Sequence, residues 1–133
     1  MTRYLLDTNI ISDLIRHPQG KASARIGKVG ESNICTSIIV AAELRYGCAK
    51  RGSRRLLEAV EELLGEIEVL PFDAPADAEY GSIRSALEAA GRLVGGNDLL
   101  IAAHARALGA TIVTANAQEF RRVRGLRVEN WLA

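Results

Sequence analysis

Short apolar runs alternate with longer amphipathic stretches along the whole chain. The short runs are rich in leucine and β-branched residues, which favours β-strands, and they cover residues 3–6, 33–36, 67–70 and 111–114. Between them, apolar residues recur every three or four positions, as on a helix with one buried face. This spacing predicts a helix beginning after residue 9 and further helices over residues 22–29, 38–49, 54–64, 73–90 and 98–108. Residues 126–128 supply a fifth strand if the sheet has one.

Capping residues and glycines mark where these helices start and stop. Ser37 is placed to cap the helix over residues 38–49, and Gly65, Gly91 and Gly109 follow the last helical positions of three later helices. The helix over residues 54–64 is amphipathic, and its predicted inward residues are Leu56, Leu57, Val60, Leu63 and Leu64.

The order of these elements predicts the α/β class. Strands separated by helices require crossover connections, so the central sheet of four or five strands should be mainly parallel and flanked by helices. The chain has 133 residues, of which 48% are apolar, and this predicts one domain over residues 1–133.

Several features predict a cytoplasmic protein without a membrane anchor. No signal peptide is visible, and no apolar run reaches the roughly 20 residues of a membrane helix. Cys35 and Cys48 lie in apolar stretches outside any metal-type spacing. They are predicted to be buried free thiols, which suits a reducing compartment.

The charge is nearly balanced, with 17 basic and 16 acidic residues, and neither favours nor excludes a nucleic-acid partner. Fourteen of the basic residues are arginine, whose planar guanidinium suits phosphate and carboxylate groups. A genome rich in G and C explains the same bias. Four arginines near the C-terminus either contact RNA phosphates or form a solvated face, namely Arg121, Arg122, Arg124 and Arg127.

Polar side chains stand close to the predicted strand ends. Asp7 follows the first strand, Asn116 follows the fourth, and Asp98 opens the helix that leads into the fourth. Glu43 lies in the helix after the second strand. Because sites in open parallel sheets lie outside the carboxyl ends of the strands, we expect these four residues to meet at one edge.

Each acidic residue also has a purely structural interpretation. Asp7 is a good helix cap, and Asp98 lies where a carboxylate favours the helix dipole. Glu43 interrupts an apolar run, so its carboxylate must be paired, neutralised or bound to a metal. The alternative partner for Glu43 is a distant arginine, since Arg45 points to another face of the helix.

If the three carboxylates converge, their repulsion favours a bound cation. At about 4 Å and an effective dielectric constant of about 20, each pair repels by roughly 4 kcal/mol. Oxygen ligands prefer magnesium or manganese to zinc. The predicted metal ligands are Asp7, Glu43 and Asp98, and such a metal orients water and polarises a phosphoryl oxygen.

Four short motifs, taken in order, resemble those of the PIN-domain ribonucleases. They are LLDTN at residues 5–9, ELRYG at 43–47, NDLLIAAHA at 97–105, and VTAN at 113–116 followed by Glu119 and Phe120. The closing segment GLRVENW at residues 125–131 is similar to that of VapC, the toxin of the VapBC toxin–antitoxin pairs. Any one motif is weak, but the ordered set covers essentially the whole chain.

The resemblance implies a three-layer PIN-like fold and RNA cleavage that depends on Mg²⁺ or Mn²⁺. It implies metal ligands at the positions of Asp7, Glu43 and Asp98, a homodimer, and a cognate VapB-type antitoxin bound in or beside the active-site groove. One position departs from the family, because a fourth acidic residue, often aspartate, falls on Asn116. Glu119, one helical turn later, is the candidate to supply the missing charge, and a second metal site depends on it.

The competing function is non-catalytic, either a receiver-like regulatory domain or a nuclease-fold binding module. Receiver domains need an acidic pair near the end of the first strand and a late lysine, whereas Asp7 stands alone and the last lysine is Lys50. Phosphatases of the haloacid dehalogenase type need Asp-x-Asp, and Asn9 holds the third position here. His17 and His104 lie in no metal-type spacing and are predicted to be structural or exposed. The sequence therefore favours an endoribonuclease toxin.

Overall fold

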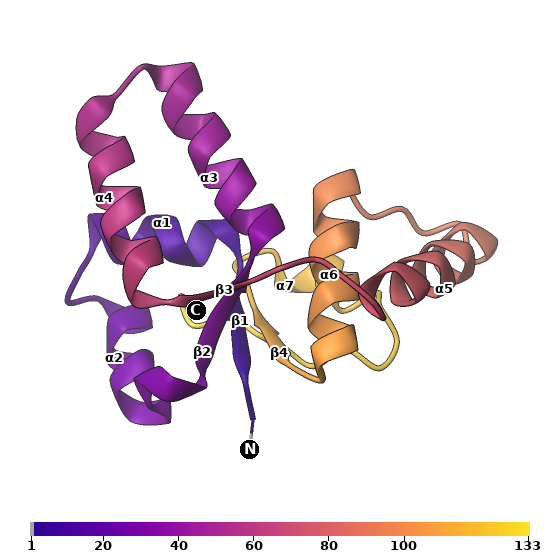
Figure 1. Ribbon diagram of the computed structural model, residues 1–133. Coiled ribbons are helices and arrows are strands. Elements are labelled where there is room, and N and C mark those ends of the chain that lie inside the picture. Colours follow the sequence, from indigo (N-terminus) through magenta and orange to yellow (C-terminus); the bar gives the residue numbers. More distant parts are fainter. Residues whose placement is uncertain (1) are drawn as a thin grey trace.

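A parallel sheet lies between two helical layers in the computed structural model, which describes residues 2–133 (Figure 1). Its five strands follow the order β3-β2-β1-β4-β5, and every neighbouring pair is parallel. This confirms the predicted fold class, including the fifth strand. The strands are β1 (Tyr4–Leu6), β2 (Ile34–Ser37), β3 (Glu68–Leu70), β4 (Thr111–Val113) and β5 (Val128–Glu129).

Pairs of helices connect the first four strands in sequence, the single short helix α7 connects β4 to β5, and the helices cover the sheet on both faces. In Figure 1, α1 to α4 lie on one side of the central strands, and α5 and α6 lie on the other. The helices are α1 (Thr8–Arg16), α2 (Lys21–Val29), α3 (Ile38–Arg51), α4 (Arg54–Glu66), α5 (Ala76–Ala89), α6 (Gly96–Leu108) and α7 (Ala117–Phe120), with a short 3₁₀ turn at Glu31–Asn33. No helix within residues 2–133 is long and apolar enough to cross a membrane.

The central strands are buried on both faces. Leu5 and Leu6 of β1, and Ile112 and Val113 of β4, are fully enclosed. Parallel strands covered by helices on both faces need such continuous apolar runs, which is why these strands lack a polar face. The buried residues of both helical layers join one core cluster.

Several predicted boundaries shift in the structure. The helix predicted from residue 73 begins at Ala76, because Pro75 lacks an N–H group and its ring disfavours helical geometry in the residue before it. Gly65 does not end α4, which continues to Glu66. Leu57, predicted to point inward, is 38% exposed. The one-turn helix α7 was not predicted.

The strand order positions the site. β1 and β4 are neighbours, yet their helical connections pass over opposite faces of the sheet, and this leaves a crevice at their carboxyl ends. The register pairs Leu6 with Val113, so Asp7 and Thr114 follow side by side at this edge. Gly109, at φ +66°, ends α6 in the left-handed conformation that the sequence predicted for it.

Candidate functional site

Asp7 is the most enclosed carboxylate of the site, with 2% of its surface exposed. One of its oxygens accepts the Thr8 N–H at 2.8 Å, which caps α1, and the other accepts the Thr114 hydroxyl at 2.7 Å. Burial raises the pKa of Asp7, these hydrogen bonds oppose the rise, and Glu43 adds to it. The cap interpretation is therefore confirmed, and it fixes the carboxylate at the end of β1.

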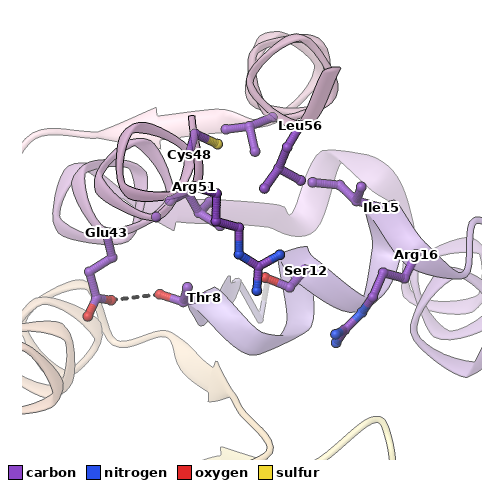
Figure 2. A pocket seen from close by; sticks show the side chains of 11 residues that line it. Thr8, Ser12, Ile15, Arg16, Glu43, Cys48, Arg51 and Leu56 are labelled. Atoms are coloured by element: carbon purple, nitrogen blue, oxygen red, sulfur yellow. Dashed lines mark hydrogen bonds between the residues drawn. The ribbon is translucent and has the colours of Figure 1, made fainter. Parts of the chain in front are cut away.

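Glu43 faces the same place from the second turn of α3. Its Oε1 accepts the Thr8 hydroxyl at 2.6 Å, as Figure 2 shows, and its Oε2 accepts the Asn97 amide at 3.1 Å. Within residues 2–133 no arginine forms an ion pair with Glu43, and Arg45 pairs instead with Glu61. The alternative of a distant arginine partner is thus wrong for the described part of the chain.

Asp98 lies in the first turn of α6 and is half-buried. Burial, and then the negative charges of Asp7, Glu119 and Glu43, together raise the pKa of this carboxyl to about 7. Carboxylates supplied by three separate segments therefore repel Asp98 across a short space.

One open groove brings together all four residues named from the sequence. Asp7, Glu43, Asp98 and Asn116 line it, and the other lining residues are Thr8, Asn9, Ser12 and Arg16. The segments that carry them are spread over the sequence from Asp7 to Asn116, so only the fold can bring them together.

The groove supplies oxygen ligands, but its carboxylates are not gathered around a point. Among the described residues 2–133, no three Asp, Glu, His or Cys side chains are arranged to hold a metal ion. Like charges repel, and here Asp7 and Glu43 are directed toward hydroxyl and amide donors instead. The donor chemistry fits a hard divalent cation, and side-chain rotation is needed to complete its ligand set.

Asn116 and Glu119 have different surroundings. Asn116 lines the groove at the start of α7, and its N–H donates to the Thr114 hydroxyl at 3.0 Å. Glu119 is outside that lining set, and its Oε1 accepts the Gly95 N–H at 2.9 Å. Glu119 therefore joins α7 to the loop that precedes Asp98.

An apolar cavity of about 210 Å³ adjoins the carboxylate groove (Figure 2). It lies between α1, α3 and α4, and apolar residues such as Ile15, Leu44 and Leu56 line it. Thr8, Ser12, Arg16 and Glu43 line both hollows, so the two form a continuous surface.

Sequence reasoning missed the neutral residues that hold the acids. Thr8 and Asn97 stand next to Asp7 and Asp98 in the two acidic motifs, yet both bind Glu43. Their proximity to the acids in sequence was the only signal available. His104 is buried and structural, His17 is exposed, and both cysteines are buried free thiols, as predicted.

Comparison with known proteins identifies the family. Residues 4–126 match the PIN domain.

The chain belongs to the PIN-domain family.

Within this PIN-domain family, its relatives are VapC ribonucleases, so the predicted recognition is confirmed. The chain is 37% identical over 133 residues to Ribonuclease VapC2 of Haemophilus influenzae, covering 99% of this chain and 100% of the relative. It is 39% identical over 132 residues to the tRNA(fMet)-specific endonuclease VapC of Shigella flexneri, covering 98% and 99%.

Solved VapBC complexes share the fold. VapBC2 from Rickettsia felis, bound to a DNA fragment from its promoter, contains a chain with a TM-score of 0.89 and 37% identity to this PIN domain. The match covers 98% of this chain and 99% of that one. The three-layer PIN-like architecture predicted from the sequence is thereby confirmed.

Proposed function

We propose that this VapC-type PIN domain is a divalent-metal-dependent endoribonuclease and the toxin of a type II toxin–antitoxin pair. Asp7, Glu43 and Asp98 are the proposed metal ligands, with Mg²⁺ as the expected ion and Mn²⁺ as an alternative. The observation that supports this most directly is the shared groove, in which these three carboxylates and Asn116 face one space.

The residues around the carboxylates set their positions. Thr114 and the Thr8 N–H hold Asp7, while the Thr8 hydroxyl and Asn97 hold Glu43. When bound, a divalent cation orients the attacking water and stabilises charge on the phosphoryl oxygens. Arg16, which is exposed at the rim of the groove, provides a cationic group for a neighbouring phosphate.

RNA is the proposed substrate, and transfer RNA is the first substrate to assay. The support is the Shigella flexneri relative, named as a tRNA(fMet)-specific endonuclease and 39% identical to this chain. A non-catalytic, receiver-like function has no comparable support, because residues 4–126 match the PIN domain and the relatives at 37–39% identity are named as ribonucleases.

The proposed partner is a cognate VapB-type antitoxin, and the proposed state of the toxin is a homodimer. Structural relatives were solved as VapBC complexes. We assign the apolar cavity between α1, α3 and α4 to an antitoxin segment, because it offers apolar burial and opens directly into the carboxylate groove. An arginine on that segment can then pair with the carboxylates and inhibit the enzyme.

The test is RNA cleavage by purified protein with and without added Mg²⁺. We expect cleavage to need the metal, to stop in excess chelator, and to fall by at least about 100-fold in Asp7→Asn and Asp98→Asn, since even indirect partners of metal ligands matter 10- to 100-fold. Circular dichroism of each variant checks that the fold is kept. Full activity in chelator, or in both variants, would refute the proposed metal-dependent mechanism.

A further inference from the structure

A second hollow, lined by arginines, lies at the C-terminal end of α7, whose N-cap residue Asn116 lines the carboxylate groove. It is formed by the loop between α5 and α6 and by the end of α7, and its lining residues are Gly91, Arg92, Leu93, Gln118, Arg121 and Arg122. A neighbouring hollow shares Arg92 and Arg122 and adds Arg106 and Arg124. We call Arg92, Arg121, Arg122 and Arg124 the arginine track.

The two hollows of the arginine track contain no carboxylate, because no aspartate or glutamate of the described residues lines either of them. Glu88 shares a third hollow with Arg92, but it forms an ion pair with Arg84. The ion pairs found within residues 2–133 involve other arginines, among them Arg106, which pairs with Glu79. The chain carries 16 acidic residues, so its composition does not force four guanidinium groups to gather without a carboxylate. Their mutual repulsion favours a bound anion.

The backbone beneath the arginine track is held in place. Arg122 donates to the Leu93 carbonyl at 2.7 Å, and Arg106 donates to the Arg124 carbonyl at 2.9 Å. The guanidinium groups of Arg92, Arg121 and Arg124 form no hydrogen bond within the described part of the chain, and all three residues are exposed. Their donors are therefore available to a ligand on an ordered surface.

The arginine track starts next to the proposed catalytic groove. Asn116 lines the groove, and Arg121 follows it by five residues across helix α7, a rise of about 7.5 Å. On the other segment, the loop that carries Arg92 leads into the first turn of α6, where Asp98 lies. The Glu119–Gly95 hydrogen bond joins these two segments. Along α7, the arginine track thus begins about one and a half helical turns from the groove.

A phosphodiester strand matches this layout better than a single small anion does. The track presents four cationic side chains in two hollows that share Arg92 and Arg122, and an RNA strand carries phosphates on both sides of the bond to be cut. Arginine also binds phosphate bidentately through its planar fork.

We propose that the arginine track binds phosphates of the RNA strand beside the scissile bond and aligns that strand with the carboxylate groove. This inference rests on the proposed ribonuclease function. Phosphate contacts position a strand without reading its bases, so the arginine track contributes affinity and alignment and leaves sequence choice unchanged.

A binding experiment tests the arginine track without requiring cleavage. The protein is the full chain carrying Asp7→Asn, and the probe is a fluorescent single-stranded RNA oligonucleotide followed by anisotropy at several KCl concentrations. The double variant Arg92→Ala/Arg121→Ala should lower the magnitude of the slope of log K against log salt by about 1.4, or roughly 0.7 per lost phosphate contact. The matched control is Arg54→Ala/Arg55→Ala, which removes two exposed arginines of α4 that line neither hollow and should keep the slope.

Cleavage kinetics of the otherwise wild-type protein provide a second readout. Arg92→Ala/Arg121→Ala should raise KM for RNA by about tenfold and leave kcat nearly unchanged, because it removes binding common to the ground and transition states. Arg92→Lys/Arg121→Lys should restore most of the affinity by restoring the charge. Neither alanine change removes an intramolecular side-chain hydrogen bond, so the fold should be kept.

The outcomes separate the two proposals. Equal salt slopes and equal KM values for the track and control variants, with wild-type cleavage intact, would overturn the arginine track alone. A track variant that binds RNA normally but no longer binds the antitoxin would assign this surface to an acidic protein segment and would also overturn it. Absence of RNA cleavage by the wild type would contradict the proposed function. The binding experiment would still test whether the arginine track binds RNA phosphates, because it does not require cleavage.

Discussion

Ser37 and His104 form a buried hydrogen bond, with the Ser37 hydroxyl 2.7 Å from Nδ1 of the imidazole. Ser37 ends β2 and caps α3, the helix that carries Glu43, whereas His104 lies in α6, the helix that carries Asp98. The imidazole also bonds the Pro71 backbone and packs edge-on against Phe72, with ring centroids 5.4 Å apart. This bond therefore connects the two helices that present acids to the groove.

The first prediction concerns the pH dependence of stability. Burial lowers the pKa of His104 below its usual value of 6.5, while Asp73 and the bond to Pro71 oppose the shift. The unfolded chain thus takes up a proton at a higher pH than the folded chain does. The contribution of His104 to stability is complete above about pH 6.5 and declines as the pH falls, by at most about 1.4 kcal/mol per unit.

Urea unfolding of wild type and His104→Gln between pH 5.5 and 7.5 measures this effect. The free-energy difference between the two proteins should shrink toward low pH, because the variant has no imidazole to protonate. His17→Gln, at an exposed position at the end of α1, is the control and should parallel the wild type. A difference that stays constant over this range would contradict the prediction.

The second prediction concerns Thr8, which donates its hydroxyl to Glu43 at 2.6 Å. Thr8→Val keeps the shape but leaves Glu43 with only the Asn97 amide, so RNA cleavage should fall by about 10- to 100-fold, as for other partners of metal ligands. Thr8→Ser keeps the hydroxyl and should stay near wild type. Equal losses in both variants would show that the methyl group, and not the hydrogen bond, is what matters.

The third prediction separates stability from activity at Asp98. This carboxylate is partly desolvated and repelled by Asp7, Glu119 and Glu43, so Asp98→Asn should stabilise the metal-free protein at neutral pH. The same high Mn²⁺ concentration should then raise the melting temperature of the wild type more than that of the variant, because the stabilisation of the folded state grows with the logarithm of the ligand concentration divided by its dissociation constant. Calorimetry with and without Mn²⁺ measures both shifts, and an equal metal response in the two proteins would remove Asp98 from the ligand set.

Sequence patterns predicted the strands and the long helices well because each has a local signature. The buried strands are apolar runs, and the helices carry apolar residues at helical spacing over several turns. Helix α7 was not predicted, because its four residues complete only about one turn and show no periodicity. Leu57 was misplaced because helical spacing defines a face but not how far the neighbouring elements cover it.

The convergence of the three acidic residues on one groove could be expected from the sequence, whereas their hydrogen-bond partners could not. Asp7 and Asp98 stand at element boundaries, and Glu43 interrupts an apolar run, so each leaves a mark in the sequence. The bonds from Thr8 and Asn97 to Glu43 join residues 35 and 54 positions apart, and the Ser37–His104 bond spans 67. Contacts over such distances depend on the register of the sheet and the packing of α3 against α6, which no local pattern encodes.

The last prediction concerns Asn116, which stands at the fourth acidic position of the family, and Glu119, the candidate to supply the missing charge. Asn116→Asp adds a negative charge where the groove has an amide. It should lower the Mg²⁺ concentration for half-maximal cleavage by about tenfold, because the Coulomb attraction between a carboxylate and a dication in contact is about 1 kcal/mol or more even in water. Asn116→Ala should cost less than Asp7→Ala, since a neutral amide contributes less to holding a dication than a carboxylate does.

Glu119 distinguishes charge from loop support. Its Oε1 accepts the Gly95 N–H, and glutamine can accept the same bond without the charge. If Glu119 mainly holds the loop before Asp98, Glu119→Gln stays close to wild type and Glu119→Ala loses activity. If it supplies the missing acid, both variants lose activity and need more Mg²⁺. The geometry favours loop support, so cleavage rate against Mg²⁺ concentration should show this first pattern. A different result would contradict the three-carboxylate site. If Asn116→Ala lost as much cleavage activity as Asp7→Ala while Glu119→Gln kept wild-type activity, Asn116 itself would be essential.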